Sequence, residues 1–127
     1  MIFCHIVDDY YLQGILASMK QRKWWKENAP EKLYKHDYIA ALFMHSFSWA
    51  FVVMLIPAYY ALTSKYASGD GFEIISSQII VAFIINLVIH AVTDHAKANL
   101  HKINLIQDQL IHMMQIISIW LYLVVIR

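Results

Sequence analysis

The stretch Ile39–Leu62, IAALFMHSFSWAFVVMLIPAYYAL, contains no charged residue. A helix needs about 20 mostly apolar residues to cross the hydrocarbon core of a bilayer, so this stretch predicts a membrane-spanning helix. Pro57 lacks a backbone N–H and predicts a kink near the end of that helix. The stretch therefore places the chain among membrane proteins.

Two later stretches are also apolar enough to cross a bilayer. Residues 74–96 contain one charged side chain, Asp94, and residues 103–126 contain one, Asp108. Residues 2–20 are less apolar, because two aspartates and a histidine interrupt them, and they lack the basic start and small-residue cleavage site of a signal peptide. We expect this segment to form a fourth helix whose polar face turns inward.

These four stretches predict an all-α fold, a four-helix transmembrane bundle with a polar His/Asp site inside it. Residues 20–37 hold six of the ten Lys and Arg residues, and residues 97–102 form a short basic turn. The positive-inside rule predicts that both connections lie in the cytoplasm. The expected single domain covers residues 1–127, with helices at about 2–20, 37–63, 72–98 and 103–126.

The composition excludes several classes of protein. The chain has 127 residues, 60% of them hydrophobic, and a formal net charge of +1. Binding of nucleic acid needs a concentrated basic surface, so no such partner is expected. The single cysteine, Cys4, allows no internal disulfide and no Cys-rich zinc motif.

Polar residues recur one helical turn apart within the apolar stretches. Side chains at i and i+4 share a helix face, and at 1.5 Å per residue each stretch places polar groups roughly 10–17 Å from its cytoplasmic end. Ionisable groups inside a membrane are rare and usually mark function. The polar stripes are His5, Asp9 and Gln13; His45; Asn86, His90, Asp94 and Lys97; and Asp108, His112 and Gln115.

Imidazole and carboxylate groups at one depth predict a divalent metal site, with zinc first and iron or manganese as alternatives. One or two ions are expected, because the candidates outnumber the ligands of one tetrahedral ion. Taken singly, each histidine could be a packing residue, and an aspartate could pair with Lys97. Asp8 points about 100° from Asp9 on an α-helix and is expected to play a supporting role. The predicted metal ligands are His5, Asp9, His45, His90, Asp94, Asp108 and His112.

The ordered motifs H-x3-D-x3-Q, H-S, H-x3-D-x2-K and D-Q-x2-H together resemble a small bacterial and phage membrane family, domain of unknown function 3307. Tyr10 departs from the phenylalanine usual in that family. The resemblance implies a bacterial inner-membrane or phage protein, similar in style to inner-membrane metal-dependent hydrolases. The matching residues are His5, Asp9 and Gln13; His45; His90, Asp94 and Lys97; and Asp108, Gln109 and His112.

The first functional hypothesis is a membrane-embedded, metal-dependent hydrolase that acts on a lipid or a lipid-linked, phosphate-containing substrate. A metal-bound water would be the nucleophile. A lysine would hold a phosphate as a point charge, and glutamines would orient ligands or substrate. The predicted catalytic residues are Asp9, Asp94 and Asp108, one of them as general base, and the predicted substrate-binding residues are Lys97, Gln13 and Gln109.

Two other classes remain open. A four-helix membrane protein can hold haem between histidines such as His45, His90 and His112, although neighbouring carboxylates are an unneeded cost there. A proton or ion pathway also uses His/Asp chains, as would a phage protein that binds a host membrane partner. The expected partners are the lipid bilayer and a lipid-linked substrate, and apolar outer faces would also allow a homo-oligomer. His36, His95 and His101 lie beside the basic connections and are expected to be solvated.

Overall fold

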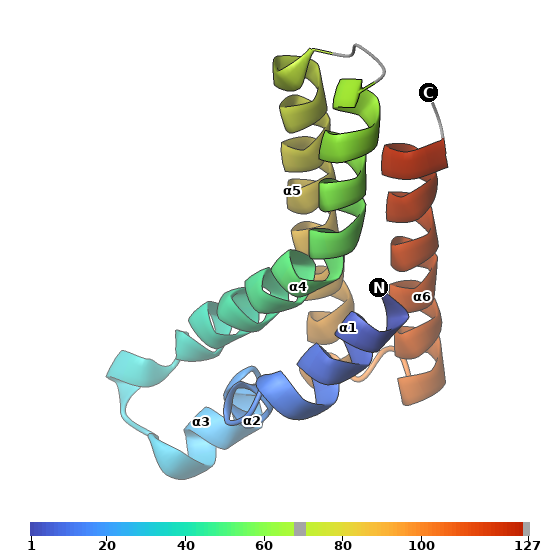
Figure 1. Cartoon of the computed structure of the whole chain (residues 1–127). Coiled ribbons are helices and arrows are strands. Elements are labelled where there is room, and N and C mark those ends of the chain that lie inside the picture. The colour runs from blue at the N-terminus through green and yellow to red at the C-terminus, as the bar shows by residue number, and fades with distance from the viewer. Residues whose placement is uncertain (68–70, 126–127) are drawn as a thin grey trace.

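The computed structural model describes residues 1–67 and 71–125 of the chain. In this part of the chain the regular elements are all helical and none is a strand, so the predicted all-α class is confirmed. Three long helices form the body of the molecule, and short N-terminal helices pack against it (Figure 1). These short helices contribute to the polar centre described below.

The long helices are α4 (Asp37–Ala67), α5 (Phe72–Ala98) and α6 (Leu105–Trp120), which continues as a π-helical turn over Leu121–Val125. Each is long and apolar enough to cross a membrane. The 27 residues of α5 rise about 40 Å, which exceeds the thickness of a hydrocarbon core. The described residues therefore contain three candidate spans, where the sequence predicted four.

The N-terminal segment differs from its prediction. Residues 2–20 form α1 (Ile2–Val7), a π-helical turn (Asp8–Leu12) and α2 (Leu16–Met19) instead of one continuous helix. Gly14 lies between the last two elements with φ of +47°. This left-handed conformation ends a helix, and glycine adopts it without steric cost. The segment is therefore not one of the three candidate spans, and the predicted count of four helices is not confirmed.

The basic connection folds into α3 (Arg22–Asn28) and a 3-10 turn (Lys32–Tyr34) before α4 begins. Figure 1 shows α4 bent along its length, with its first part leaning away from α5 and its later part running beside it. Pro57 lies inside α4, where it removes one backbone donor and its ring crowds the preceding turn. The sequence predicted a bend in this helix, and Figure 1 shows α4 bent.

The structure is polar inside and apolar outside. Large apolar side chains such as Ile84, Ile85 and Val92 on α5 are more than half exposed. A smaller apolar core surrounds Trp49 and Leu123. Such an arrangement fits a lipid surround, because lipid removes the penalty for exposing apolar side chains. The buried polar residues are His5, Asp8, His45, Ser46, Asn86, His90, Thr93, Asp94, Asp108, His112 and Gln115.

Candidate metal centre

Six of the predicted ligands come together where the N-terminal segment meets α4, α5 and α6. Neighbouring nitrogen and oxygen atoms of these side chains lie between 3.1 and 3.8 Å apart. All six side chains are buried except that of Asp9, which is 12% exposed. We call this group the His/Asp cluster; its members are Asp9, His45, His90, Asp94, Asp108 and His112.

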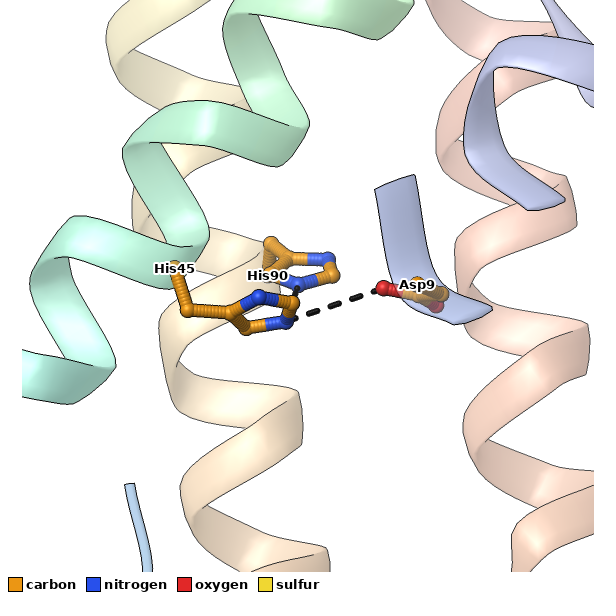
Figure 2. A group of neighbouring side chains, drawn as sticks. All are labelled: Asp9, His45 and His90. Carbon is orange, nitrogen blue, oxygen red and sulfur yellow. Dashed lines mark hydrogen bonds and ion pairs between the residues drawn. The ribbon is translucent and has the colours of Figure 1, made fainter. Parts of the chain in front are cut away.

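The first part of the His/Asp cluster joins three elements (Figure 2). Nε2 of His45 on α4 lies 3.1 Å from Nε2 of His90 on α5 and 3.6 Å from Oδ1 of Asp9 in the π-helical turn. The Nδ1 atoms of both histidines and Oδ1 of Asp9 are buried and have no hydrogen-bond partner among the described residues. These three residues could hold a metal ion, because one ligand atom from each lies within 4.8 Å of the other two.

Asp94 connects this first group to a second one. Its Oδ2 lies 3.1 Å from Nε2 of His45 and 3.8 Å from Nε2 of His90. Its Oδ1 lies 3.6 Å from Nε2 of His112 on α6. His90, Asp94 and His112 form a second group that could hold an ion. The two oxygens of one carboxylate thus face different histidines, and His90 belongs to both groups.

Neighbouring amides fix the proton on the His112 ring. The Gln115 amide donates a hydrogen bond to the backbone carbonyl of Asn86 at 3.1 Å, so its Oε1 accepts from Nδ1 of His112 at 3.0 Å. In the neutral ring the lone pair is therefore on Nε2, which faces Oδ1 of Asp94 at 3.6 Å and Oδ1 of Asp108 at 3.5 Å. A lone pair facing carboxylate oxygens is unfavourable, whereas a cation could be held there by His112 together with Asp94 and His90. This hydrogen-bonded second ring nitrogen is typical of metal-binding histidines.

Two lysines bring positive charge to the His/Asp cluster. Nζ of Lys97 lies 2.6 Å from Oδ2 of Asp108, so the lysine predicted to hold a substrate pairs with a carboxylate. Nζ of Lys20 lies 2.5 Å from Oδ2 of Asp94. Lys20 was not among the predicted site residues, because its approach depends on the turn at Gly14. Its backbone carbonyl accepts a hydrogen bond from the side chain of Asn99 at the end of α5.

The two predicted glutamines contact different neighbours. Gln109 donates to Oδ2 of Asp108 at 3.1 Å and accepts from Nε2 of His5 at 3.1 Å. Gln13 accepts from Nζ of Lys20 at 3.3 Å. Gln109 therefore orients a cluster carboxylate directly, whereas Gln13 acts on the cluster only through the lysine.

His5 also lies beside the His/Asp cluster, with its Nδ1 3.3 Å from Oδ2 of Asp9, but its ring nitrogens have other partners as well. Its Nδ1 accepts a hydrogen bond from the indole N–H of Trp49 at 2.7 Å, and its Nε2 donates to Gln109. Both ring nitrogens have protein partners, so this arrangement leaves His5 no free lone pair for a metal ion. The same tryptophan stacks on the ring of His90 with centroids 4.3 Å apart. Trp49 thus orients two histidines, a role that its position in an apolar run did not indicate.

Asp8 is fully buried, although α-helical spacing predicted that it would point away from Asp9. The backbone N–H of Gln13 donates to the carbonyl of Asp8 at 3.0 Å, a bond that spans five residues and widens this turn into a π-helix. Both aspartates therefore turn inward, and Asp8 accepts from the Ser48 hydroxyl at 2.6 Å. Burial raises the pKa of Asp9, although the nearby His5 opposes this effect.

The other three histidines lie outside the His/Asp cluster. His36 and His101 are exposed, as expected for side chains beside the basic connections. His95 is half-buried and stacks on the ring of Tyr38 with centroids 6.1 Å apart.

No protein-family model matches the chain, and no curated protein or solved structure matches it. The function is therefore inferred from the sequence and from the geometry of the His/Asp cluster.

Proposed function

We propose that the chain is a membrane-embedded hydrolase that uses one or two divalent metal ions in the His/Asp cluster to cleave a lipid or lipid-linked substrate. The observation that carries the proposal is the convergence of histidine nitrogens and aspartate oxygens that have no hydrogen-bond partner in the described part of the chain. Three of these unpaired atoms are buried, namely Oδ1 of Asp108, Nε2 of His112 and Oδ1 of Asp9. Buried polar atoms are normally satisfied, so these unpaired acceptors support the binding of one or two cations in the cluster.

The spacing of these atoms supports a metal site. Ligands about 2.0–2.1 Å from a tetrahedral ion lie about 3.3 Å from one another. The His45–His90 separation of 3.1 Å and the His112–Asp108 separation of 3.5 Å are close to this value. Histidine with carboxylate is a donor set suited to zinc, with iron and manganese as alternatives. Zinc is therefore the first candidate.

Asp94 supports the proposal of two ions. Its Oδ2 faces His45 and His90, while its Oδ1 faces His112. A carboxylate in this position can bridge two ions a few ångströms apart, as in two-metal hydrolytic sites. Asp9 would complete one ion site and Asp108 the other.

A bound divalent ion would lower the pKa of water toward neutrality and stabilise negative charge on the substrate. In hydrolysis, the water oxygen forms a bond to the ester carbon or phosphorus while the bond to the leaving alcohol breaks. Asp9 is the candidate proton acceptor, because it is the most exposed carboxylate of the cluster, and a carboxylate that binds an ion through one oxygen keeps its other oxygen for a proton. The leaving alcohol oxygen takes up a proton. Lys20 and Lys97 are partly exposed and could contact an anionic substrate on the side of the basic connections.

The proposed location is the bacterial inner membrane, with residues 20–37 and 97–102 in the cytoplasm. The positive charge of these two connections supports this orientation. It places the partly exposed side chains of Lys20 and Lys97 near the cytoplasmic leaflet. The proposed substrate is therefore a lipid with its reactive group at that surface.

Direct contacts between the rings argue against a haem between them. His90 and His112 are stacked with centroids 4.3 Å apart, and His45 and His90 have centroids 5.0 Å apart. A planar macrocycle held between two axial histidines needs a gap between their rings. A small ion needs no such gap.

A proton pathway is the second candidate, and one contact favours it. The His45 and His90 Nε2 atoms lie 3.1 Å apart, a distance at which one proton is shared. Asp94→Glu separates the two functions, because a relay tolerates a longer carboxylate and a metal site loses its geometry. Proton flux in proteoliposomes retained by this variant would support the relay.

The hydrolase is tested by incubating zinc- or manganese-loaded protein with bacterial lipid extract and following the products by mass spectrometry. We expect a lipid species to disappear, and its loss to require both the metal and Asp9. Asp37→Asn is the matched control, because Asp37 lies at the start of α4 outside the His/Asp cluster. Stoichiometric metal without any change in the lipids would contradict the hydrolase and leave the metal site standing.

A further inference from the structure

A second polar feature lies in the basic connection and plays no part in the His/Asp cluster. A cavity of about 530 Å³ opens between α3, the 3-10 turn and the start of α4. Four cations and two aromatic rings line it, together with a single acid, Glu31. These cations and rings are Arg22, Lys26, Lys32, Lys35, Trp25 and Tyr38.

The cations around this cavity are not neutralised by the protein. In the part of the chain that the structure describes, none of the four takes part in an ion pair. Lys23 offers a contrast on the same helix, because it points elsewhere and pairs with Glu27 at 3.7 Å. Unpaired cations around a cavity attract an anion.

Arg22 is held in place before any ligand arrives. Its guanidinium lies over the ring of Tyr38, 4.7 Å from the centroid, and its Nη2 donates to the Tyr38 hydroxyl at 2.6 Å. Its backbone N–H donates to the side chain of Asn99 at 2.7 Å. A guanidinium fixed in this way binds phosphate oxygens with less loss of entropy than a free side chain.

The positive-inside rule explains why this connection is basic. It does not explain why four of the cations surround a cavity or why Arg22 is held in place, so these two features need a separate explanation. The cavity adjoins the start of α4, a candidate membrane span, so it lies at the level of lipid headgroups. Trp25, on its wall, is a side chain typical of that level.

We propose that this cavity binds the phosphate group of an anionic membrane lipid. Arg22 binds phosphate oxygens through two N–H groups, and the lysines act as point charges around them. Trp25 contacts the glycerol and upper acyl region. The proposal does not require a metal ion in the His/Asp cluster, because none of the residues that line the cavity belongs to that cluster.

The test is a binding titration of the full chain in detergent by native mass spectrometry. The probes are phosphatidic acid, diacylglycerol with the same acyl chains, and soluble glycerol 3-phosphate. We expect phosphatidic acid to bind at least about tenfold more tightly than either other probe, since several basic residues each contribute near a membrane surface. Arg22→Gln, Lys32→Gln and Lys35→Gln should each weaken this binding about fivefold.

Lys23→Gln is the matched control, because it removes the same charge from the same segment outside the cavity. Helix content by circular dichroism shows whether each variant is folded, and the exposed Lys32 and Lys35 serve if Arg22→Gln is not. Equal binding of phosphatidic acid and diacylglycerol would overturn the proposal. So would equal losses in Lys23→Gln, or glycerol 3-phosphate binding as tightly as the lipid.

Discussion

Nζ of Lys20 lies 2.5 Å from Oδ2 of Asp94, so a lysine from the N-terminal segment supplies a counter-charge to a buried carboxylate on α5. A metal ion bound by Asp94 would lie a few ångströms from this ammonium. Two like charges 4 Å apart repel by about 4 kcal/mol at an effective dielectric constant of 20. The lysine therefore opposes metal binding while it stabilises the metal-free protein.

Lys20→Met should tighten zinc binding by at least about tenfold, because it removes this repulsion. It should also lower the free energy of unfolding of metal-free protein by about 3–5 kcal/mol, because a buried charge loses its partner. Zinc should restore that stability. Isothermal titration calorimetry and thermal unfolding in detergent measure the two effects.

Lys23→Met is the control for Lys20→Met, since Lys23 is 81% exposed and its one ion pair among the described residues is with Glu27. Lys23→Met should change neither the zinc affinity nor the free energy of unfolding. If Lys20→Met loses stability and zinc does not restore it, the His/Asp cluster is a polar packing network instead of a metal site.

Gln115→Leu should weaken zinc binding about 10–100-fold without removing a ligand. The glutamine accepts the Nδ1 proton of His112 and so keeps the lone pair on Nε2. Leucine offers no acceptor, and the ring loses its fixed tautomer and orientation. The affinity is measured by competition with a fluorescent zinc chelator.

Met114→Leu is the matched control, because Met114 is one residue away from Gln115 on α6 and its side chain is 68% exposed. Equal zinc affinity in Gln115→Leu and Met114→Leu would show that the amide does not orient a ligand.

Gly14→Ala should lower the free energy of unfolding by about 1–2 kcal/mol, the cost of a left-handed conformation for an L-residue. The added methyl group meets no close neighbour, so only the φ of +47° opposes the change. Gly71→Ala should have a smaller effect, because Gly71 has φ of −65° and open space around its Cβ position. Thermal unfolding measures the loss of stability in both variants. Equal losses in Gly14→Ala and Gly71→Ala would show that the left-handed conformation at Gly14 does not disfavour a side chain.

The long apolar stretches were sufficient to predict three candidate spans. The range 72–98 is that of α5, and α4 begins at Asp37 as the composition indicated. Uncharged runs of this length have few alternatives to a membrane helix. The i, i+4 spacing on α5 and α6 also placed His90 beside Asp94 and His112 beside Asp108, because α-helical geometry holds there.

The N-terminal segment could not be predicted in the same way. The hydrophobic pattern continues through Gly14, so the break at that residue depends on packing against α4 and α5. The π-helical turn changes which residues share a face, and it buries Asp8 where 100° spacing pointed it away. The approach of Lys20 to Asp94 follows from this chain reversal, and no local spacing indicates it.

The roles of individual histidines also depended on contacts distant in sequence. His5 has the same spacing to an aspartate as His90, and this spacing predicted a metal-ligand role for both. Trp49 and Gln109 occupy both nitrogens of His5, whereas Nδ1 of His90 has no hydrogen-bond partner among the described residues. Only the packing of four segments distinguishes a supporting histidine from one that is free to bind an ion.

Metal content is the most direct test of the central claim, measured on detergent-purified protein by inductively coupled plasma mass spectrometry. His90 belongs to both candidate ion groups, whereas Asp9 belongs to one. We expect one or two zinc, iron or manganese ions per chain, near-complete loss in His90→Ala, partial loss in Asp9→Ala if two ions bind, and no change in the exposed control His101→Ala. A well-folded chain without metal after incubation with these ions, or equal metal in His90→Ala and His101→Ala, would contradict the metal centre.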